Sequence, residues 1–274
     1  MPTFDLHAWA RERPRVMGII NVTPDSFSDG GRFFARDQAL AQAERMIADG
    51  VDMIDLGAES TRPGASSVDA AQELDRLGAV LEALRDAPVP ISLDTSSPEV
   101  IREGVARGVA MINDVRALRR PGALDLVAAH GLGVCLMHMP AEPAVMQLAP
   151  SYVDVIGEVE DFLLRRVERC RQDGVPATSI AIDPGFGFGK GFAHNRALFQ
   201  ALPRLAAHGF PLVVGVSRKR MIGELTGRTS PFERDEGSLA AHVMALERGA
   251  RILRVHAVRP TVDAVRVWQG LAQH

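Results

Sequence analysis

Three polar residues follow apolar runs of this sequence and could together bind a flat heterocycle. Asp94 ends the run that begins at residue 89, Asn113 lies near the end of the run 110–114, and Asp183 ends the run 180–183. Two carboxylates and an amide supply the acceptors and donors that a ring NH and an exocyclic amino group require. The combination favours a guanine-like or pterin-like ring. For each residue alone, the alternative is a helix cap, which Asp and Asn often form.

Basic side chains form a second group that could bind an anion. The segment 217–220 (Ser-Arg-Lys-Arg) places three cations where a helix is expected to begin, and helix N-termini favour anions. Arg254 and His256 are two residues apart in an apolar run, so a strand would point both to the same side. With Arg62 they could form an anion clamp, because the planar Arg fork matches phosphate oxygens. Solvated surface cations are the alternative for the two arginines of 217–220.

The segment 183–190 (Asp-Pro-Gly-Phe-Gly-Phe-Gly-Lys) fails as a phosphate-binding loop. The Walker pattern requires Ser or Thr after its Gly-Lys, whereas Lys190 is followed by Gly191. Three glycines interleaved with Phe186 and Phe188 instead predict a mobile loop that presents an aromatic face to a flat ligand. Simple packing of both phenylalanines is an equally good alternative.

Eight apolar runs carry these side chains, and stretches with helical periodicity separate them. The runs are 16–21, 51–55, 89–94, 110–114, 133–138, 180–183, 212–217 and 252–256, and helices are expected near 37–50, 67–86, 97–108, 123–130, 152–173, 195–208, 235–248 and 260–269. Such an alternation closes most economically into an α/β fold, the (β/α)8 TIM barrel, with the active site at the C-terminal ends of the strands. We expect one domain, residues 1–274 with a core of about 15–268, whose polar strand ends converge on one pocket.

Composition places the chain among ordinary globular proteins. Hydrophobic residues make up 46% and charged residues 24% of 274 residues, and the net charge of −3 provides no global field for nucleic acid or an anionic membrane. No apolar run approaches a membrane span, and the N-terminus lacks the apolar segment of a signal peptide. Cys135 and Cys170 lack metal-ligand spacing and are predicted to be free thiols. We expect a cytoplasmic protein.

Four segments resemble the signature sequences of the dihydropteroate synthase family. They are residues 17–31 (MGIINVTPDSFSDGG), 57–64 (GAESTRPG), 183–190 (DPGFGFGK) and 254–256 (RVH), and the resemblance runs in the family's order from about Arg15 to Trp268. It implies condensation of 6-hydroxymethyl-7,8-dihydropterin diphosphate with 4-aminobenzoate, which yields 7,8-dihydropteroate and diphosphate with the help of Mg2+. It also implies a homodimer.

The resemblance assigns contacts residue by residue. The pterin would meet Asp94, Asn113, Val115, Met137, Asp183, Phe188 and Lys219. The diphosphate would meet Asn21, Thr61, Arg62, Arg254 and His256, with Asn21 also at the metal. The aminobenzoate would meet Phe27, Thr61, Arg62, Pro63, Phe188, Ser217 and Arg220. Asp94, Lys219, Asn21 and Arg254 would carry the catalysis, a dissociative substitution in which Asp94 supports a developing cation. The loops 23–36 and 59–66 would close over the bound substrates.

Some positions depart from commoner forms of the family, and two of them border the candidate site. Arg220 stands where many members have Ser, and Ala257 follows His256 where Asp is frequent, so His256 is expected to lack a partner. A pterin-dependent methyltransferase and a noncatalytic pterin-binding paralogue are the alternative functions. The anion clamp argues against the first, and the intact site residues argue against the second. The apolar residues of 241–246 are either a dimer interface or core.

Overall fold

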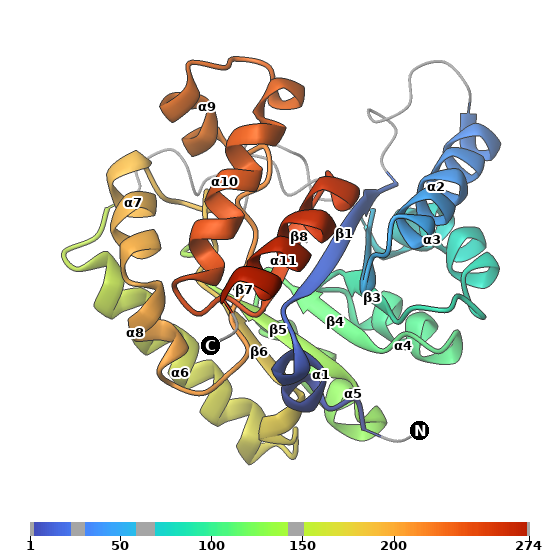
Figure 1. Ribbon diagram of the computed structural model, residues 1–274. Coiled ribbons are helices and arrows are strands. Elements are labelled where there is room, and N and C mark those ends of the chain that lie inside the picture. The colour runs from blue at the N-terminus through green and yellow to red at the C-terminus, as the bar shows by residue number, and fades with distance from the viewer. Residues whose placement is uncertain (1–2, 23–30, 59–68, 142–150, 273–274) are drawn as a thin grey trace.

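Eight parallel strands form the centre of the computed structural model, which describes residues 3–22, 31–58, 69–141 and 151–272 (Figure 1). The strands are β1 Arg15–Asn21, β2 Met53–Gly57, β3 Ile91–Asp94, β4 Met111–Asp114, β5 Gly133–Met137, β6 Ile180–Asp183, β7 Val213–Val214 and β8 Ile252–Val255. They pair in the order β6-β5-β4-β3-β2-β1-β8-β7, and a bridge between Ile182 and Leu212 joins the two ends. The predicted (β/α)8 barrel is confirmed.

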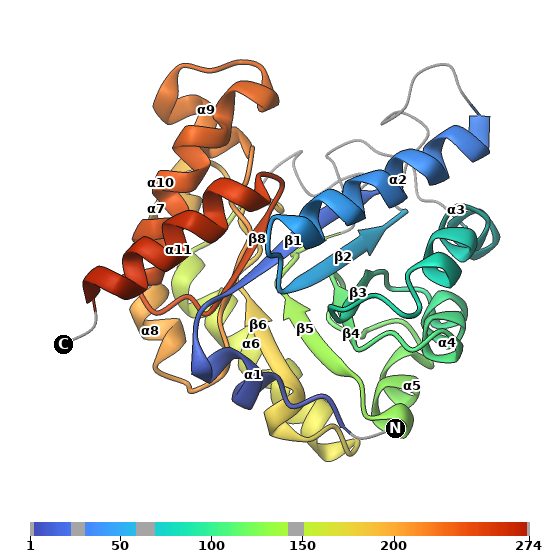
Figure 2. The ribbon, with the colours of Figure 1, turned by 45° about the vertical axis from the view of Figure 1, so that its right-hand side comes forward.

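Helices surround the strands, as both views of the ribbon show (Figures 1 and 2). They are α2 Gly31–Ala48, α3 Ala70–Ala83, α4 Pro98–Ala106, α5 Ala123–His130, α6 Val155–Gln172, α7 Phe192–Gln200, α8 Leu202–Ala206, α9 Arg220–Thr226, α10 Asp235–Leu246 and α11 Val258–Ala272, with short 3-10 turns η2 Ala177–Ser179 and η3 Pro231–Arg234. Ser97 caps α4, because its hydroxyl accepts from Val100 N. The single helix predicted over 195–208 is two helices, since Pro203 lies in the first turn of α8 and begins a new one.

A helix that the sequence analysis did not anticipate closes the N-terminal end of the barrel. α1 Leu6–Glu12 buries Leu6 and Ala10 against Met17, Met53 and Met111 inside the ring. In both views α1 lies at the end opposite α9 (Figures 1 and 2). The interior at the N-terminal end of the barrel is therefore a packed apolar layer.

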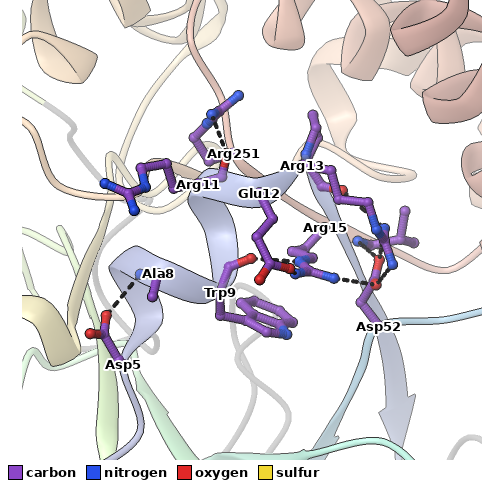
Figure 3. A network of polar contacts seen from close by, with 11 residues as sticks. Asp5, Ala8, Trp9, Arg11, Glu12, Arg13, Arg15, Asp52 and Arg251 are labelled. Atoms are coloured by element: carbon purple, nitrogen blue, oxygen red, sulfur yellow. Dashed lines mark hydrogen bonds and ion pairs between the residues drawn. The ribbon is translucent and has the colours of Figure 1, made fainter.

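Ion pairs connect the segment that follows α1 to the residue that precedes β2. Asp52, buried just before β2, accepts from the guanidinium groups of Arg13 and Arg15 and from Val16 N at 2.8 Å (Figure 3). Arg15 also donates to Trp9 O at 2.7 Å and lies 5.0 Å from the Trp9 ring centroid. The network satisfies a buried carboxylate and ties α1 to the barrel floor.

Within the described residues, no helix is long and apolar enough to cross a membrane. Cys135 and Cys170 are buried and free, as predicted. Ala245 and Leu246, two of the candidate interface residues, belong to the apolar core between strands and helices.

Candidate active site at the C-terminal mouth

Strand register brings the predicted site residues to one level. Asn21 pairs with Gly57, Gly57 with Asp94, and Asp94 with Asn113, so these residues line up across four neighbouring strands. Met137 pairs with Asp183 in the same way on β5 and β6. Side-chain direction alternates along each strand. Asn21, Gly57 and Asn113 lie an even number of residues after the inward-facing Met17, Met53 and Met111 of the same strands, so they also face inward. The strand ends therefore converge, as the sequence predicts.

Asp55, to which sequence reasoning assigned no role, is the centre of the polar network inside the barrel. It is fully buried and accepts hydrogen bonds from Ser92 Oγ at 2.7 Å, Asn113 Nδ2 at 3.0 Å and Arg254 Nε at 2.7 Å. These donors come from β3, β4 and β8. Asp55 thus orients both Asn113 and Arg254. The sequence signal for its inward direction was its distance of two residues from Gly57 on the same strand.

Arg254 links two carboxylates at the base of the mouth. Besides Asp55, its Nη2 donates to Asp94 Oδ2 at 2.6 Å. Burial alone would lower the pKa of Arg254, but Asp55 and Asp94 raise it further above its ordinary value. The cation is permanent and is oriented by buried Asp55 and partly buried Asp94, so the mouth holds a fixed positive group beside Asp94.

Lys219 and Asp183 form a second charged pair of the mouth. Asp183 Oδ1 accepts from Gly185 N at 2.7 Å, and burial raises the pKa of Asp183 although Lys219 opposes the shift. Lys219 donates to Phe186 O, and its Nζ lies 4.5 Å from the centroid of the Phe188 ring. Burial lowers the pKa of Lys219 to about 8, while Asp183 acts in the opposite direction. This pair can supply both a hydrogen-bond acceptor and a titratable cation to a ligand.

An apolar wall adjoins these polar groups. Val115, Met137 and Met139 form a buried cluster against which Phe188 packs. Acceptors and donors on one side and an apolar surface on the other suit a flat polar ring.

The segment 183–190 behaves differently from the mobile aromatic loop that we expected. Phe186 is fully buried and packs at 5.9 Å from the Phe199 ring, so only Phe188 borders the mouth. Lys190 is 3% exposed and donates to carbonyl oxygens of the segment itself, a structural role that sequence reasoning missed. The loop is held in place from within.

His256 has a partner, contrary to the expectation drawn from Ala257. Its Nδ1 lies 3.0 Å from Ser217 Oγ, which also accepts from His256 N at 3.1 Å. Ser217, which comes shortly after β7, thus holds the imidazole in the way that was expected of an Asp at position 257. β7 ends earlier than predicted, at Val214, but Ser217 keeps the inward parity.

The two arginines that flank Lys219 lie in different surroundings. Arg218 has a positive φ of 59° and is engaged by Asp235 through two bonds of 2.7 Å, with its guanidinium 5.1 Å from the Phe232 ring centroid. It is therefore occupied by α10 and η3 and does not serve the anion clamp. Arg220 begins α9, pairs with Glu224 at 2.7 Å and has a side chain that is 91% exposed. A contact from Arg220 to substrate stays a prediction.

Four predicted site residues, Phe27, Thr61, Arg62 and Pro63, lie outside the described residues, as do most of the loops 23–36 and 59–66. In the part of the chain that the structure describes, no group of three or more His, Cys, Asp or Glu side chains is arranged to hold a metal ion.

Comparison with known proteins agrees with this geometry. The family model described as "Pterin binding enzyme" matches residues 17–256, so the barrel and its mouth define a pterin-binding enzyme. The dihydropteroate synthase of Escherichia coli K12 is 50% identical over 255 residues, 93% of this chain and 90% of that protein. The chain belongs to the dihydropteroate synthase family and is a transferase.

Solved structures show the same relationship. A dihydropteroate synthase from Xanthomonas albilineans with 4-aminobenzoic acid has a TM-score of 0.91 and 51% identity, covering 96% of this chain and 94% of that one. The enzyme of the same organism with 7,8-dihydropteroate has a TM-score of 0.88 and 49% identity, with coverage of 96% and 95%.

Proposed function

We propose that the chain condenses 6-hydroxymethyl-7,8-dihydropterin diphosphate with 4-aminobenzoate to give 7,8-dihydropteroate and diphosphate. The observation that carries this proposal is the convergence of Asp94, Asn113 and Asp183 with the cations Arg254 and Lys219 at one mouth. The 4-aminobenzoic acid and 7,8-dihydropteroate in solved relatives support it.

The pterin ring is proposed to bind by its polar edge and its face. Asp183 would accept from the ring NH and the exocyclic amine, and Asn113, held by Asp55, would present its amide oxygen. Val115 and Met137 would contact the ring face. Lys219 would donate to a ring acceptor while its ammonium is retained below about pH 8.

The substitution is proposed to be dissociative. The C–O bond to diphosphate breaks first, and Asp94 stabilises the positive charge that develops on the pterin methylene. The neutral arylamine nitrogen then forms the C–N bond and afterwards loses one proton. Arg254 and His256 would receive the leaving diphosphate, which leaves as an anion beside a fixed cation.

Mg2+ is the cofactor that this reaction suggests, and Asn21 fits it. A Cβ placed on Gly57 would lie 3.3 Å from Asp94 Cβ and 3.6 Å from Asn21 Oδ1, so the Asn21 amide oxygen and the Asp94 side chain lie on either side of Gly57 at the mouth. Mg2+ prefers oxygen ligands and commonly keeps water and phosphate oxygens, so one protein ligand is enough. When bound, the ion would neutralise charge on the leaving diphosphate.

The aminobenzoate is proposed to lie between Phe188 and the turn formed by Ser217 to Arg220. Phe27, Thr61, Arg62 and Pro63 remain proposed contacts that the described residues do not include. A pterin-dependent methyltransferase, the alternative from sequence, would need no paired diphosphate ligands, whereas Arg254 and His256 both lie on the last strand and its end.

A release assay tests the proposed activity. The purified protein, incubated with pterin diphosphate, 4-aminobenzoate and Mg2+, should release diphosphate only when both substrates are present. Omission of Mg2+ should slow the reaction. No diphosphate release from the folded protein would refute the proposal and favour a noncatalytic pterin-binding protein.

We further propose that the chain is a cytoplasmic homodimer. Met244 on α10 and Val267 and Leu271 on α11 are exposed apolar side chains on neighbouring helices, and a second copy of the chain could cover them. Sedimentation equilibrium should give twice the monomer mass, and cell fractionation should recover the protein with cytoplasmic markers.

A further inference from the structure

Lys190 is buried inside the protein, beneath the turn that borders the mouth, and has no part in the proposed reaction. Its Nζ lies 2.9 Å from Gly185 O, 2.9 Å from Phe188 O, 3.3 Å from His138 O and 2.9 Å from His138 Nδ1. All of these contacts join the turn 185–188, which follows β6, to the end of β5. A buried amine with this set of acceptors fixes the backbone around it.

The opposite side of the same turn holds Lys219. Phe186 O accepts from Lys219 Nζ, and the Phe188 ring lies 4.5 Å from that nitrogen. A Cβ on Gly187, at φ 81°, would lie 3.2 Å from Lys219 Cδ. The turn is thus sandwiched between two lysines, one inside the protein and one at the mouth.

Further contacts keep the turn from adopting another shape. A Cβ on Gly185 would lie 2.0 Å from His138 O, so only glycine allows this approach. Asn195 Oδ1 accepts from Gly187 N at 2.8 Å, and its Nδ2 donates to Lys190 O at 3.0 Å. Of Lys190, Asn195 and Lys219, only Lys190 donates to the carbonyl oxygens of Gly185 and Phe188.

We propose that Lys190, together with His138, is a positioning residue for the pterin site. It fixes the turn 185–188 so that the Phe186 carbonyl and the Phe188 ring hold the Lys219 ammonium beside Asp183. The proposal rests on the proposed function of the mouth, but it concerns the placement of Lys219 and needs no turnover to be tested.

His138 acts in this arrangement as a neutral acceptor. Burial, and to a smaller extent Lys190, lower the pKa of His138 to about 3, so its Nδ1 keeps a lone pair at neutral pH. Burial and then Lys219 lower the pKa of Lys190 as well. Either charge state of Lys190 donates hydrogen bonds, so the positioning does not require its titration.

The first test replaces Lys190 by methionine, which keeps the length of the side chain and removes every donor. Pterin diphosphate affinity is measured by quenching of protein fluorescence, and kcat/KM is measured from pH 6 to 10. The charged groups that act on the pKa of Lys219 are Asp183, Arg254 and Asp94, and Lys219 itself lowers the pKa of Lys190.

We expect the Lys190→Met protein to bind pterin diphosphate about tenfold or more weakly, since small displacements of a binding group are costly. We expect the alkaline limb of its pH profile to move down by about one pH unit, because the ammonium loses a carbonyl and an aromatic ring. Wild-type affinity together with an unchanged limb refutes the proposal.

A paired substitution at His138 serves if Lys190→Met fails to fold. His138→Asn retains an acceptor near the position of Nδ1, whereas His138→Leu has the same shape without one. The leucine variant should show the weaker binding and the shifted limb, and the asparagine variant should restore both. Equal behaviour of the two variants overturns the proposal.

Glu160→Gln provides the structural control. Glu160 is buried on α6 and pairs with Arg204 and His208, so this change loosens the protein away from the mouth. It should lower thermal stability and leave the alkaline limb in place. If wild-type protein binds pterin diphosphate without turnover, the proposed reaction fails while the positioning of Lys219 remains testable through affinity.

Discussion

Replacing Asp55 by asparagine tests whether one buried carboxylate organises the mouth. Asparagine keeps an oxygen for Ser92 Oγ, which is 2.7 Å from Asp55 Oδ1. Its NH2 group, however, would face Arg254 Nε and Asn113 Nδ2, which now donate at 2.7 and 3.0 Å. Two favourable contacts become donor-donor contacts, and the partly buried cation of Arg254 loses one of its two carboxylates.

The expected cost follows from the burial of this network. Removing one partner of a buried ion pair costs about 3–5 kcal/mol, and we expect the lower end because Arg254 keeps Asp94. At roughly 2–4 °C per kcal/mol, the melting temperature should fall by about 6–12 °C. Displacement of Arg254 should also lower kcat by about 10²-fold.

Urea unfolding followed by circular dichroism measures the stability change, and diphosphate release measures turnover. Asp263→Asn is the control, because Asp263 forms an exposed pair with Arg266 and its loss should change stability by less than about 0.5 kcal/mol. A folded Asp55→Asn protein that loses less than about 1 kcal/mol and turns over normally would contradict the role assigned to Asp55.

Three further substitutions separate chemistry from stability. Asp94→Ala should lower turnover by about 10²-fold or more with circular dichroism unchanged, and near-normal turnover would refute its electrostatic role. The kcat/KM of the wild type should fall above about pH 8 as Lys219 loses its proton, whereas Lys219→Met should be slow throughout. Between pH 8 and the unfolded pKa near 10.5, only the unfolded chain keeps the Lys219 proton. The free energy of unfolding of the wild type, relative to that of Lys219→Met, should therefore increase as the pH rises through this range. A difference between the two proteins that does not change with pH in urea titrations would contradict this. Asp52→Ala should destabilise the protein by about 2–3 kcal/mol through Arg13 and Arg15 while kcat/KM stays unchanged, and a matching loss of activity would show that the barrel floor reaches the mouth.

Strand parity explains why much of the mouth was predictable. Asp94, Asn113, Asp183 and Arg254 follow from apolar runs, because an inward-facing residue at a strand end has only the mouth to face. The resemblance of four sequence segments to the dihydropteroate synthase family then predicted which substrate each of these residues would bind. A single sequence contains enough to place these side chains, although not to pair them.

The parts that sequence reasoning missed depend on contacts between distant segments. Asp55 acquires its role from Ser92, Asn113 and Arg254 on three other strands. Ser217 replaces the neighbour that His256 lacks in the chain, through a bond across 39 residues. Such pairings become visible only when the barrel closes.

The helix predictions that were wrong have local causes. α1 is only seven residues long, too short for a clear periodic pattern, and its stability comes from the barrel floor that it covers. Pro203 divided a predicted helix because its ring begins a new first turn. Arg218 was predicted as a candidate anion ligand, but it pairs with Asp235, which lies 17 residues away in the chain.

The position of α1 has a practical consequence for handling the protein. Because α1 covers the end of the barrel opposite the mouth, a surface tether attached ahead of Leu6 would leave the mouth facing solution (Figure 1). Immobilisation through that end should therefore preserve ligand access in a biosensor or a flow reactor.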